Sequence, residues 1–510
     1  MSSALSPPHN RHTERLVVAG SAVLLASIFG NGLNYLLGVF LARSFGAMQF
    51  GLYALGLTFF STLTLIVPLG MDTGAIKFIS EYRVRQDQPA ILRTIVYASG
   101  ITFVTSLLSA LCLVGFAGTI SESLYRKPEL TTLLIYFAAG IPLYAVTGIC
   151  LSCLQAHQTV RPLIMVRYLW EPVSKCAFAG LAVWAGWGLT GVLWGILITL
   201  LTSLVVTIRL VSALPSAGAQ GVDLWRGPDV RKLLAYCLPL GTATLVGVIT
   251  PRADMFILGS WASMHEIGIY QAAFQTAAAL TLILGALETS LTPFFGQLHA
   301  AHDKNGLEQM YQTASRLVFL FTVPLFVFLA VFNEEALSVF GQEFRAGGVL
   351  LTILAAGQLL SSAGGSPNNL LLMGGHSRLV MWNTIGVGIV SLGVFAVMIP
   401  YWGVLGAAIG AATTQVLGVG IRILQVWRIH RIQPFTRRLS KPILAGMGTA
   451  LFALSVKPII PNVLLPVLGC GMGLLYVFLL IMLKIDAQDR KSLDAIVQKA
   501  KLLVATRAQC

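Results

Sequence analysis

Seven charged side chains interrupt long apolar stretches of this chain. They are Asp72, Lys77, Glu171, Lys175, Arg252, Asp254 and Glu288. A charge at the centre of a membrane helix costs about 2.5–3.5 kcal/mol on insertion scales, so such residues usually face a partner or an aqueous cavity. No nucleophile–base pairing and no metal-ligand cluster accompanies them in the sequence. Their expected chemistry is therefore the binding of ions or charged ligands within a membrane.

Arg252 is the strongest candidate for binding an anion. It follows Pro251 in an apolar stretch, and a guanidinium presents a planar fork of donors that matches phosphate oxygens. Asp254, two residues on, would face away from Arg252 in a regular helix, although Pro251 can distort that geometry. We expect Arg252 to bind a diphosphate or a sugar acid, or alternatively to pair with an acid on a neighbouring helix.

Two oppositely charged pairs have the spacing of neighbours on a helix face, Lys77 with Glu81 and Glu171 with Lys175. Residues four apart on a helix can neutralise each other. The alternative for Glu171 and Lys175 is to line a substrate cavity. Lys77 lies near a predicted helix end, where its long side chain can also extend to lipid headgroups.

Polar side chains also lie in the first apolar stretch, where Asn31 and Asn34 are three residues apart. Amide side chains can bind sugar hydroxyls, but in membrane helices they also form hydrogen bonds to neighbouring helices. We therefore keep Asn31 and Asn34 as candidate substrate-binding residues beside Arg252, Lys77, Glu171 and Lys175.

Three acids are candidates for coupling transport to an ion, namely Asp72, Asp254 and Glu288. Asp72 and Glu288 occupy nearly equivalent positions of an internal repeat of about 217 residues. A carboxylate in an apolar cavity has a raised proton affinity and can hold a proton or Na⁺. The alternative is that each acid pairs with a basic neighbour.

The composition predicts the elements that must hold these residues. Hydrophobic residues make up 56% of the 510-residue chain and charged residues 11%, against about 25% charged in a soluble protein. The apolar stretches are long and continuous, which predicts membrane-spanning helices rather than the short alternating strands of a barrel. The fold class is therefore an all-α polytopic membrane protein, and its net charge of +14 is not a sign of nucleic-acid binding.

Charge-free runs and their breaks predict 14 membrane helices. They lie near 16–42, 51–76, 94–119, 131–153, 164–185, 188–208, 233–257, 267–290, 317–332, 347–373, 380–400, 404–421, 442–456 and 463–483.

The distribution of Lys and Arg predicts the orientation. With a cytoplasmic N-terminus, 26 of the 34 basic residues fall in inside segments, Arg161 and Arg167 among them, and 5 fall in outside segments. Cytoplasmic loops carry such an excess, so both termini are expected in the cytoplasm. The predicted organisation is an N-terminal segment (1–15), an N-lobe of six helices (16–210), a linker (211–232), a C-lobe of six helices (233–422), a basic loop (423–441), two further helices (442–483) and a tail (484–510).

An internal repeat supports the two lobes. Phe50-Gly-Leu-Tyr53 recurs as Ile267-Gly-Ile-Tyr270, and Trp187-Gly-Leu-Thr-Gly191 recurs as Trp402-Gly-Val-Leu-Gly406, at shifts of 217 and 215. An even number of helices per repeat preserves orientation, so the lobes would be parallel repeats around a central cavity. Two such lobes are the usual architecture of alternating-access transport.

The stretch Arg43-Ser-Phe-Gly-Ala-Met-Gln-Phe-Gly-Leu-Tyr-Ala-Leu55, with Gly70-Met-Asp-Thr-Gly74 and Lys77-Phe-Ile-Ser-Glu-Tyr82, resembles the N-terminal signature of polysaccharide-biosynthesis flippases. Arg252-Ala-Asp-Met-Phe-Ile-Leu-Gly259 and Gly341-Gln-Glu-Phe344 fit the same pattern. These are the Wzx-type oligosaccharide flippases of the multidrug/oligosaccharidyl-lipid/polysaccharide (MOP) exporter superfamily.

The resemblance implies translocation of undecaprenyl-diphosphate-linked oligosaccharide across the bacterial inner membrane, for O-antigen, capsule or exopolysaccharide synthesis. It also implies a basic cavity that meets the diphosphate, and a polysaccharide polymerase and export machinery as partners. No cofactor is expected. The absence of a nucleotide-binding loop motif leaves a proton or Na⁺ gradient, or the membrane potential, as the expected driving force.

Three other functions compete with this interpretation. A cation-coupled multidrug exporter would share the architecture but would need neither the basic groups nor the last two helices. A lipid-linked peptidoglycan-precursor flippase belongs to the same superfamily, but no motif here singles it out. A membrane O-antigen polymerase or ligase would need a sizeable outside loop with catalytic polar residues, and the predicted outside loops 120–130 and 333–346 are short.

Overall fold

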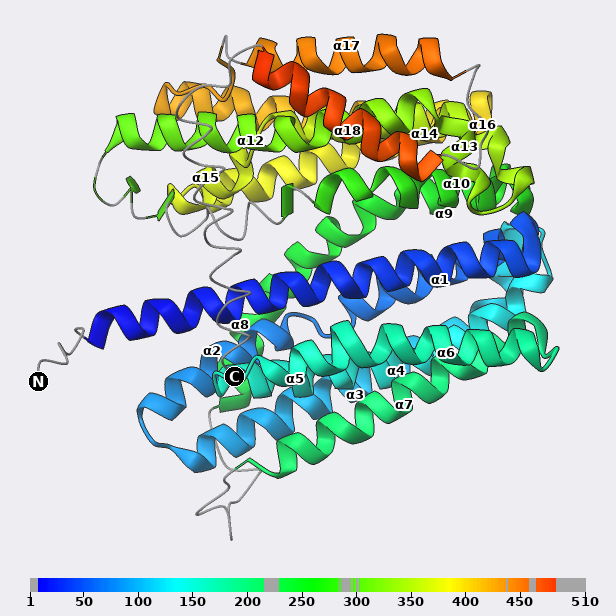
Figure 1. Cartoon of the computed structure of the whole chain (residues 1–510). Helices are drawn as coiled ribbons and strands as arrows, with labels where there is room; N and C mark the ends of the chain where they lie inside the picture. Colours follow the sequence, from blue (N-terminus) through cyan, green and yellow to red (C-terminus); the bar gives the residue numbers. More distant parts are fainter. Residues whose placement is uncertain are drawn as a thin grey trace, which may run out of the picture. The chain divides into compact units, whose positions relative to one another are not determined.

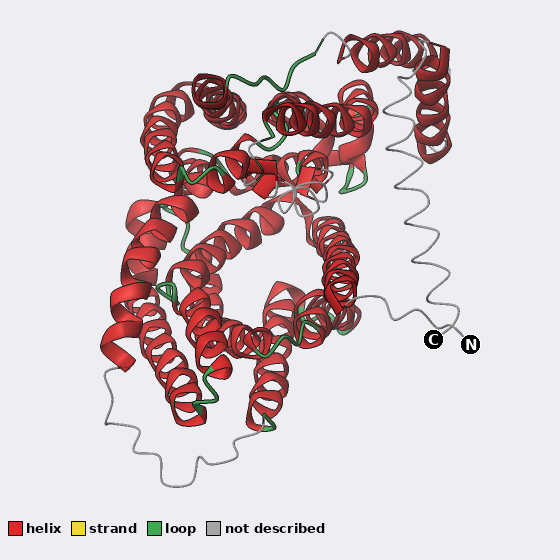
Figure 2. Cartoon of the chain, turned by 90° about the vertical axis from the view of Figure 1, so that its left-hand side faces the viewer, coloured by secondary structure: helices red, strands yellow, loops and turns green. Residues whose placement is uncertain are grey.

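The computed structural model describes residues 8–214, 229–282, 284–285, 295–296, 298–299, 301, 303–436, 439–457 and 465–482. Within these residues every regular element is a helix and no strand occurs (Figure 2). Seven helical stretches in the described part are long and apolar enough to cross a bilayer, and two of them, Leu25–Val84 and Ser377–His430, each cover two predicted spans. The chain is thus an all-α polytopic membrane protein, as its composition predicts.

The helices in chain order are α1 (Pro8–Ile66), α2 (Met71–Val84), α3 (Gln88–Gly118), α4 (Glu129–Ala156), α5 (Arg161–Leu163), α6 (Glu171–Trp184), α7 (Gly188–Ser212), α8 (Asp229–Ile249), α9 (Ala253–Trp261), α10 (Met264–Ala277), α12 (Lys304–Val331), α13 (Asn333–Ser338), α14 (Gly348–Ala363), α15 (Pro367–Met373), α16 (Ser377–His430), α17 (Ser440–Val456) and α18 (Leu465–Met482). A π-helical segment, Ile164–Trp170, joins α5 to α6 without a break. A second π-helical segment, Thr119–Leu124, follows α3, and Thr250–Arg252 and Gln342–Gly347 are 3₁₀ helices.

The predicted spans lie mostly on helix in the described residues, although 233–257 and 347–373 are each interrupted by a turn and α10 ends at Ala277 within the predicted span 267–290. α1 and α16 each contain two predicted spans, separated at Gly46 (φ 78°) and Gly403 (φ 54°). Such positive φ angles are open to glycine because it has no Cβ. The prediction of one continuous second span over 51–76 is wrong, because the chain leaves the helix after Ile66 and turns through Leu69 (φ 49°) and Gly70 (φ 79°) before α2 begins.

The chain divides into two compact units. The first comprises Met1–Ala272, Phe340–Phe344 and Thr384–Gly410, and the second comprises Ala273–Val339, Arg345–Asn383 and Ala411–Cys510. In the first unit, α3, α4, α6 and α7 run side by side (Figure 1), and α1 packs against α4 and α6. The six-plus-six lobe boundaries and the cavity between the lobes stay predictions.

The second unit is built around α12, which packs against α14, α17 and α18. Its core includes Phe319 and Val323 of α12, Ala445 of α17 and Met472 of α18. Lys457, just after α17, forms an ion pair with Glu335 at 3.3 Å and donates to the carbonyl of Val331 at 2.6 Å. The two C-terminal helices predicted from the sequence are therefore attached to α12 by apolar packing and by this lysine.

Glycines bring backbones into direct contact at several places in the first unit. A Cβ on Gly51 would collide with the carbonyl oxygen of Met264, and a Cβ on Gly268 would collide with that of Ala47. The residues of each pair, Gly51 with Gly268 and Ala47 with Met264, are 217 positions apart, which is the spacing of the repeat. The contact therefore has the two-fold symmetry that the sequence repeat predicts.

Another close approach joins the turn before α2 to α8. A Cβ on Gly241 of α8 would lie 2.7 Å from the backbone carbon of Leu69, and a Cβ on Gly70 would lie 2.8 Å from the carbonyl oxygen of Cys237. Cys237 and Leu233 of α8 complete the apolar cluster formed by α2, α3 and α4. α8 is thus packed tightly on α2, and both lie beside a helix break, at 67–70 and at 250–252.

Candidate functional site

Three charges lie on one face of the fifth predicted span. Arg167 Nη1 donates to Glu171 Oε1 at 2.8 Å, and Lys175 Nζ lies 3.6 Å from Glu171 Oε2. The Glu171 side chain is 3% exposed, whereas the side chains of Arg167 and Lys175 are each 19% exposed. The predicted Glu171–Lys175 pair therefore forms. Arg167 is a third member that sequence analysis assigned to an inside segment, although its spacing of four residues from Glu171 was a signal.

The neighbouring helices hold this span in place. The guanidinium carbon of Arg167 lies 3.6 Å from the ring centroid of Tyr144 on α4, which is a cation–π contact. Trp170 Nε1 donates to Thr202 Oγ1 on α7 at 3.1 Å. A Cβ on Gly30 of α1 would lie 2.8 Å from the carbonyl oxygen of Tyr168, so α1 approaches the π-helical segment closely.

Arg252 lies where the seventh predicted span is interrupted. α8 ends at Ile249, the turn Thr250–Arg252 follows, and α9 begins at Ala253. Pro251 removes a backbone donor in this turn, which explains the break. Arg252 is half-buried and lies in the 3₁₀ turn, whereas Asp254 lies in the first turn of α9. The predicted separation of these two residues on a regular helix therefore does not apply.

Asp254 is buried, with 3% exposure, and both of its oxygens accept hydrogen bonds. Tyr270 Oη donates to Oδ2 at 2.6 Å and the backbone N–H of Met255 donates to Oδ1 at 2.7 Å. Tyr270 itself is fully buried. This arrangement satisfies the carboxylate within the protein and favours a role in joining α9 to α10, while ion coupling by Asp254 stays a prediction.

Of the two possibilities that the sequence left open for Lys77, pairing with Glu81 does not occur. Glu81 Oε1 instead accepts from Arg85 Nη2 at 2.7 Å. The Lys77 ammonium lies 3.7 Å from the ring centroid of Tyr236 on α8 and 5.3 Å from that of Phe78. Glu81 pairs with Arg85 rather than with Lys77 because Arg85 lies four residues away on the C-terminal side, where the helix dipole favours a cation.

The other predicted site residues are exposed or lie outside the described residues. Asp72 is exposed in the first turn of α2, where a carboxylate also stabilises the helix dipole. Asn31 and Asn34 are exposed on α1. Glu288 lies outside the described residues, so its predicted equivalence to Asp72 stays a prediction.

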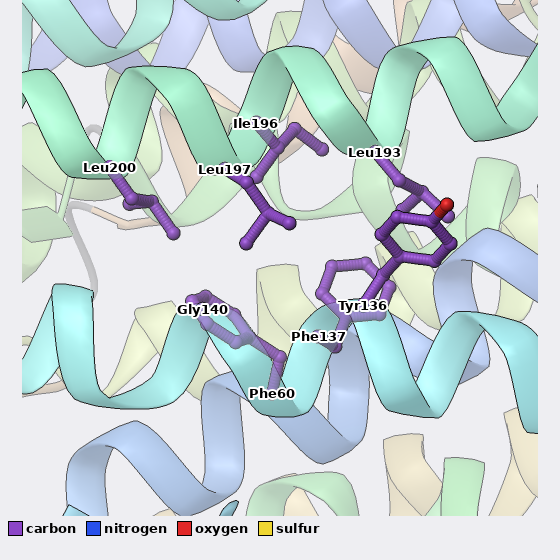
Figure 3. A pocket seen from close by; sticks show the side chains of 8 residues that line it. All are labelled: Phe60, Tyr136, Phe137, Gly140, Leu193, Ile196, Leu197 and Leu200. Atoms are coloured by element: carbon purple, nitrogen blue, oxygen red, sulfur yellow. The ribbon is translucent and has the colours of Figure 1, made fainter.

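A small gap between α1, α4 and α7 is lined entirely by aliphatic and aromatic residues (Figure 3). They are Phe60, Tyr136, Phe137, Gly140, Leu193, Ile196, Leu197 and Leu200. A site for an anionic ligand needs cationic or hydrogen-bonding groups, and this lining supplies no charge. The candidate site therefore consists of the charged residues described above, and this gap is not part of it.

Comparison with known proteins identifies the family. The polysaccharide biosynthesis protein family model matches residues 17–299, more than half of the chain. The chain belongs to this family. A second model, MatE, matches residues 239–391. Among curated relatives of this family member is a probable low-salt glycan biosynthesis flippase, Agl15, of Haloferax volcanii, which is 24% identical over 397 residues, covering 76% of this chain and 79% of the relative.

Solved structures show that this polysaccharide biosynthesis protein has the fold of the MOP superfamily. The lipid II flippase MurJ in an inward closed conformation matches with a TM-score of 0.73 and 14% identity, over 89% of this chain and 97% of MurJ. An inward-facing multidrug resistance MATE transporter of the MOP superfamily matches with a TM-score of 0.66 and 14% identity, over 83% of this chain and 99% of the transporter. These relatives are flippases and transporters rather than enzymes.

Proposed function

We propose that this protein is a flippase that moves an undecaprenyl- or other polyprenyl-diphosphate-linked oligosaccharide across the cytoplasmic membrane for O-antigen, capsule or exopolysaccharide synthesis. Membership of the polysaccharide biosynthesis family and likeness to a probable glycan biosynthesis flippase support this function. The MOP fold supports transport by alternating access of two repeats. In this proposal both termini lie in the cytoplasm, and the polymerase and export machinery act on the delivered glycan.

The observation that carries the proposal is the position of Arg252. A half-buried guanidinium lies at the interruption of a membrane helix, and interrupted helices are typical of substrate sites in transporters. The acid two residues on is held by Tyr270 and Met255. A diphosphate would match the guanidinium in charge and in planar, two-point hydrogen bonding.

The driving force in this proposal is a proton or Na⁺ gradient, or the membrane potential. An anionic substrate carries charge across the membrane, so its movement responds to the potential by about 2.3 kcal/mol per charge per 100 mV. The candidate coupling acids remain Asp72, Asp254 and Glu288.

A flipping assay in proteoliposomes tests the proposal and gives the first prediction. The substrate is a fluorescent polyprenyl-diphosphate oligosaccharide, and the variants are Arg252→Ala and Arg345→Ala. A hydrogen bond to a charged group contributes about 1.5–3 kcal/mol, so Arg252→Ala is expected to slow flipping at least tenfold. Arg345, which forms a surface pair with Glu334 at 3.2 Å, is the matched control and is expected to stay within twofold of wild type. Full activity in a folded Arg252→Ala variant would contradict the role of Arg252.

The second candidate is a cation-coupled multidrug exporter. The MatE model match and the MATE structure favour it. It predicts efflux of organic cations from the same proteoliposomes when a proton or Na⁺ gradient is imposed. Efflux of cations with no flipping of the diphosphate lipid by wild type would replace the flippase by the exporter.

A further inference from the structure

The Arg167–Glu171–Lys175 group carries more positive charge than its own carboxylate balances. Two cations share one carboxylate, so the net charge of the group is positive by one. Glu171 is buried beneath them and both cations remain partly exposed. Within the described residues these cations form no ion pair with any other acid. A partly buried cation without a counter-charge is unfavourable, so the group favours the arrival of an anion.

Lys175 has donors to spare. Its contact with Glu171 is 3.6 Å long, which exceeds the length of an ordinary N–H···O hydrogen bond. An ammonium carries three donors, and in the described structure the Lys175 ammonium makes no shorter polar contact. The Lys175 ammonium therefore lies beside Glu171 and is available to an incoming ligand.

The backbone at this place is also unusual. Arg167 lies within the π-helical segment Ile164–Trp170, which continues directly into α6 at Glu171. π-helical turns are rare and are frequent at functional sites. Tyr144 from α4 and Thr202 from α7 fix this segment on two sides. A preorganised pair of cations loses little side-chain freedom when it binds a ligand.

We propose that Arg167 and Lys175 form a phosphate-binding site for the lipid diphosphate, with Tyr144 as a positioning residue and Glu171 as the carboxylate that the phosphate displaces. This inference rests on the proposed flippase function, because it assigns the phosphate to the transported lipid. The same chemistry would suit a phospholipid headgroup or free phosphate, and the test separates these sources. Binding would replace the shared Glu171 contacts by direct contacts from Arg167 and Lys175 to phosphate oxygens.

Equilibrium binding to the purified full-length protein in detergent is the test, and it is the second prediction. The probes are polyprenyl diphosphate, inorganic pyrophosphate and phosphatidylglycerol. Arg167→Gln and Lys175→Gln are each expected to weaken polyprenyl diphosphate binding at least tenfold, and Lys175→Arg is expected to restore most of it. Arg85→Gln, which removes an exposed cation that also pairs with a glutamate four residues away, is the matched control and is expected to bind like wild type.

Glu171→Gln distinguishes a binding site from a purely structural ion group. Removing the carboxylate frees both cations, so a folded Glu171→Gln protein is expected to bind the diphosphate at least as tightly as wild type. If instead the folded Arg167→Gln and Lys175→Gln proteins bind like wild type, the inference is overturned. Equal or stronger binding of phosphatidylglycerol would assign the site to membrane headgroups and would overturn it as well.

The outcomes for the site and for the proposed function are separable. Wild type that binds polyprenyl diphosphate through Arg167 and Lys175 but does not flip it would retain the site and reject the flippase. Wild type that flips the lipid, with Arg167→Gln and Lys175→Gln flipping and binding it equally well, would retain the flippase and reject the site.

Discussion

Asp254 illustrates how a buried charge is accommodated in this protein. Tyr270 and the Met255 backbone each donate a hydrogen bond to one of its two oxygens. Burying a carboxylate without such partners would be strongly unfavourable. Its hydrogen bonds thus explain why an acid is tolerated next to a candidate substrate-binding residue.

The third prediction concerns Tyr270→Phe. Removing the hydroxyl leaves Asp254 Oδ2 without its donor in a fully buried position, so we expect the protein to lose about 1–3 kcal/mol of stability. Thermal unfolding in detergent, followed by fluorescence, measures this. Tyr236→Phe is the control, because that ring is 37% exposed and Phe retains the face that contacts Lys77. An unchanged unfolding temperature for Tyr270→Phe would contradict the importance of this hydrogen bond.

Sequence spacing predicted some residue contacts and missed others. The i,i+4 rule predicts Glu171–Lys175 correctly, but it cannot choose between two cations that compete for one acid. Glu81 therefore pairs with Arg85 rather than Lys77, and Glu171 takes Arg167 as its closer partner. Contacts between distant parts of the chain, such as Tyr144 with Arg167, leave no local pattern in the sequence.

Helix α9 is held at its C-terminal end by a loop from another part of the first unit. Lys127 Nζ donates to the carbonyls of Gly259, at 2.7 Å, and Ala262. Tyr125 Oη donates to the carbonyl of Phe256 at 3.1 Å. The last carbonyls of a helix lack partners within the helix and carry its negative dipole end, so a lysine suits them. The α9 part of the interrupted seventh span is therefore fixed at its end, whereas α8 packs on α2.

The fourth prediction is that Lys127→Met destabilises this element. The loss of two charge-assisted hydrogen bonds is expected to cost about 1.5–3 kcal/mol and to increase amide hydrogen exchange at the end of α9. Hydrogen exchange with mass spectrometry measures the local effect. The neighbouring exposed Arg126, changed to Met, is the control and is expected to leave exchange in α9 unchanged. Equal protection of α9 in Lys127→Met and wild type would reject the capping role.

Helix existence was predictable because a long apolar run has few alternatives in a membrane. Helix boundaries were less so, because hydropathy does not detect polar turns that extend a helix. α12, for example, begins at Lys304, well before the predicted 317–332 span, with Asp303 accepting from the Gly306 N–H at 2.9 Å as its N-terminal cap. The break at 67–70 depends on backbone angles at Leu69 and Gly70, which hydropathy does not detect.

At the scale of the whole molecule, the internal repeat has a physical counterpart in the Gly51–Gly268 contact. Short motifs suggested the repeat, and their two glycines lie where backbone meets backbone. Glu343 adds to this contact, since its Oε1 accepts from the Ala47 N–H at 2.7 Å and its Oε2 lies 3.3 Å from His265 Nε2. No comparable contact in the described residues bears on the membrane orientation or on the coupling ion, and both stay predictions.

The fifth prediction is that Gly51→Ala pushes apart the two backbone segments that meet at Gly51 and Gly268. Its Cβ would meet the Met264 backbone, which cannot rotate away as a side chain can, so we expect a loss of about 1–3 kcal/mol and slower transport. Gly100→Ala on α3 is the matched control, because no atom lies within 4 Å of its Cβ position. It is expected to be neutral or stabilising, since alanine favours helix over glycine. Thermal unfolding and the flipping assay measure both effects, and equal behaviour of the two variants would contradict the close contact.

The symmetric glycine contact also bears on how such a chain can change over generations. In a dimer of two identical half-length chains, one glycine would serve both sides of the interface, and any substitution would act twice. Here the two sides belong to separate codons, so either glycine can be replaced while the other is kept. Because a substitution at either glycine would push apart the same two backbone segments, the combined effect of both is expected to be less than additive. Joining the two halves in one polypeptide thus lets the interface between them be altered one side at a time.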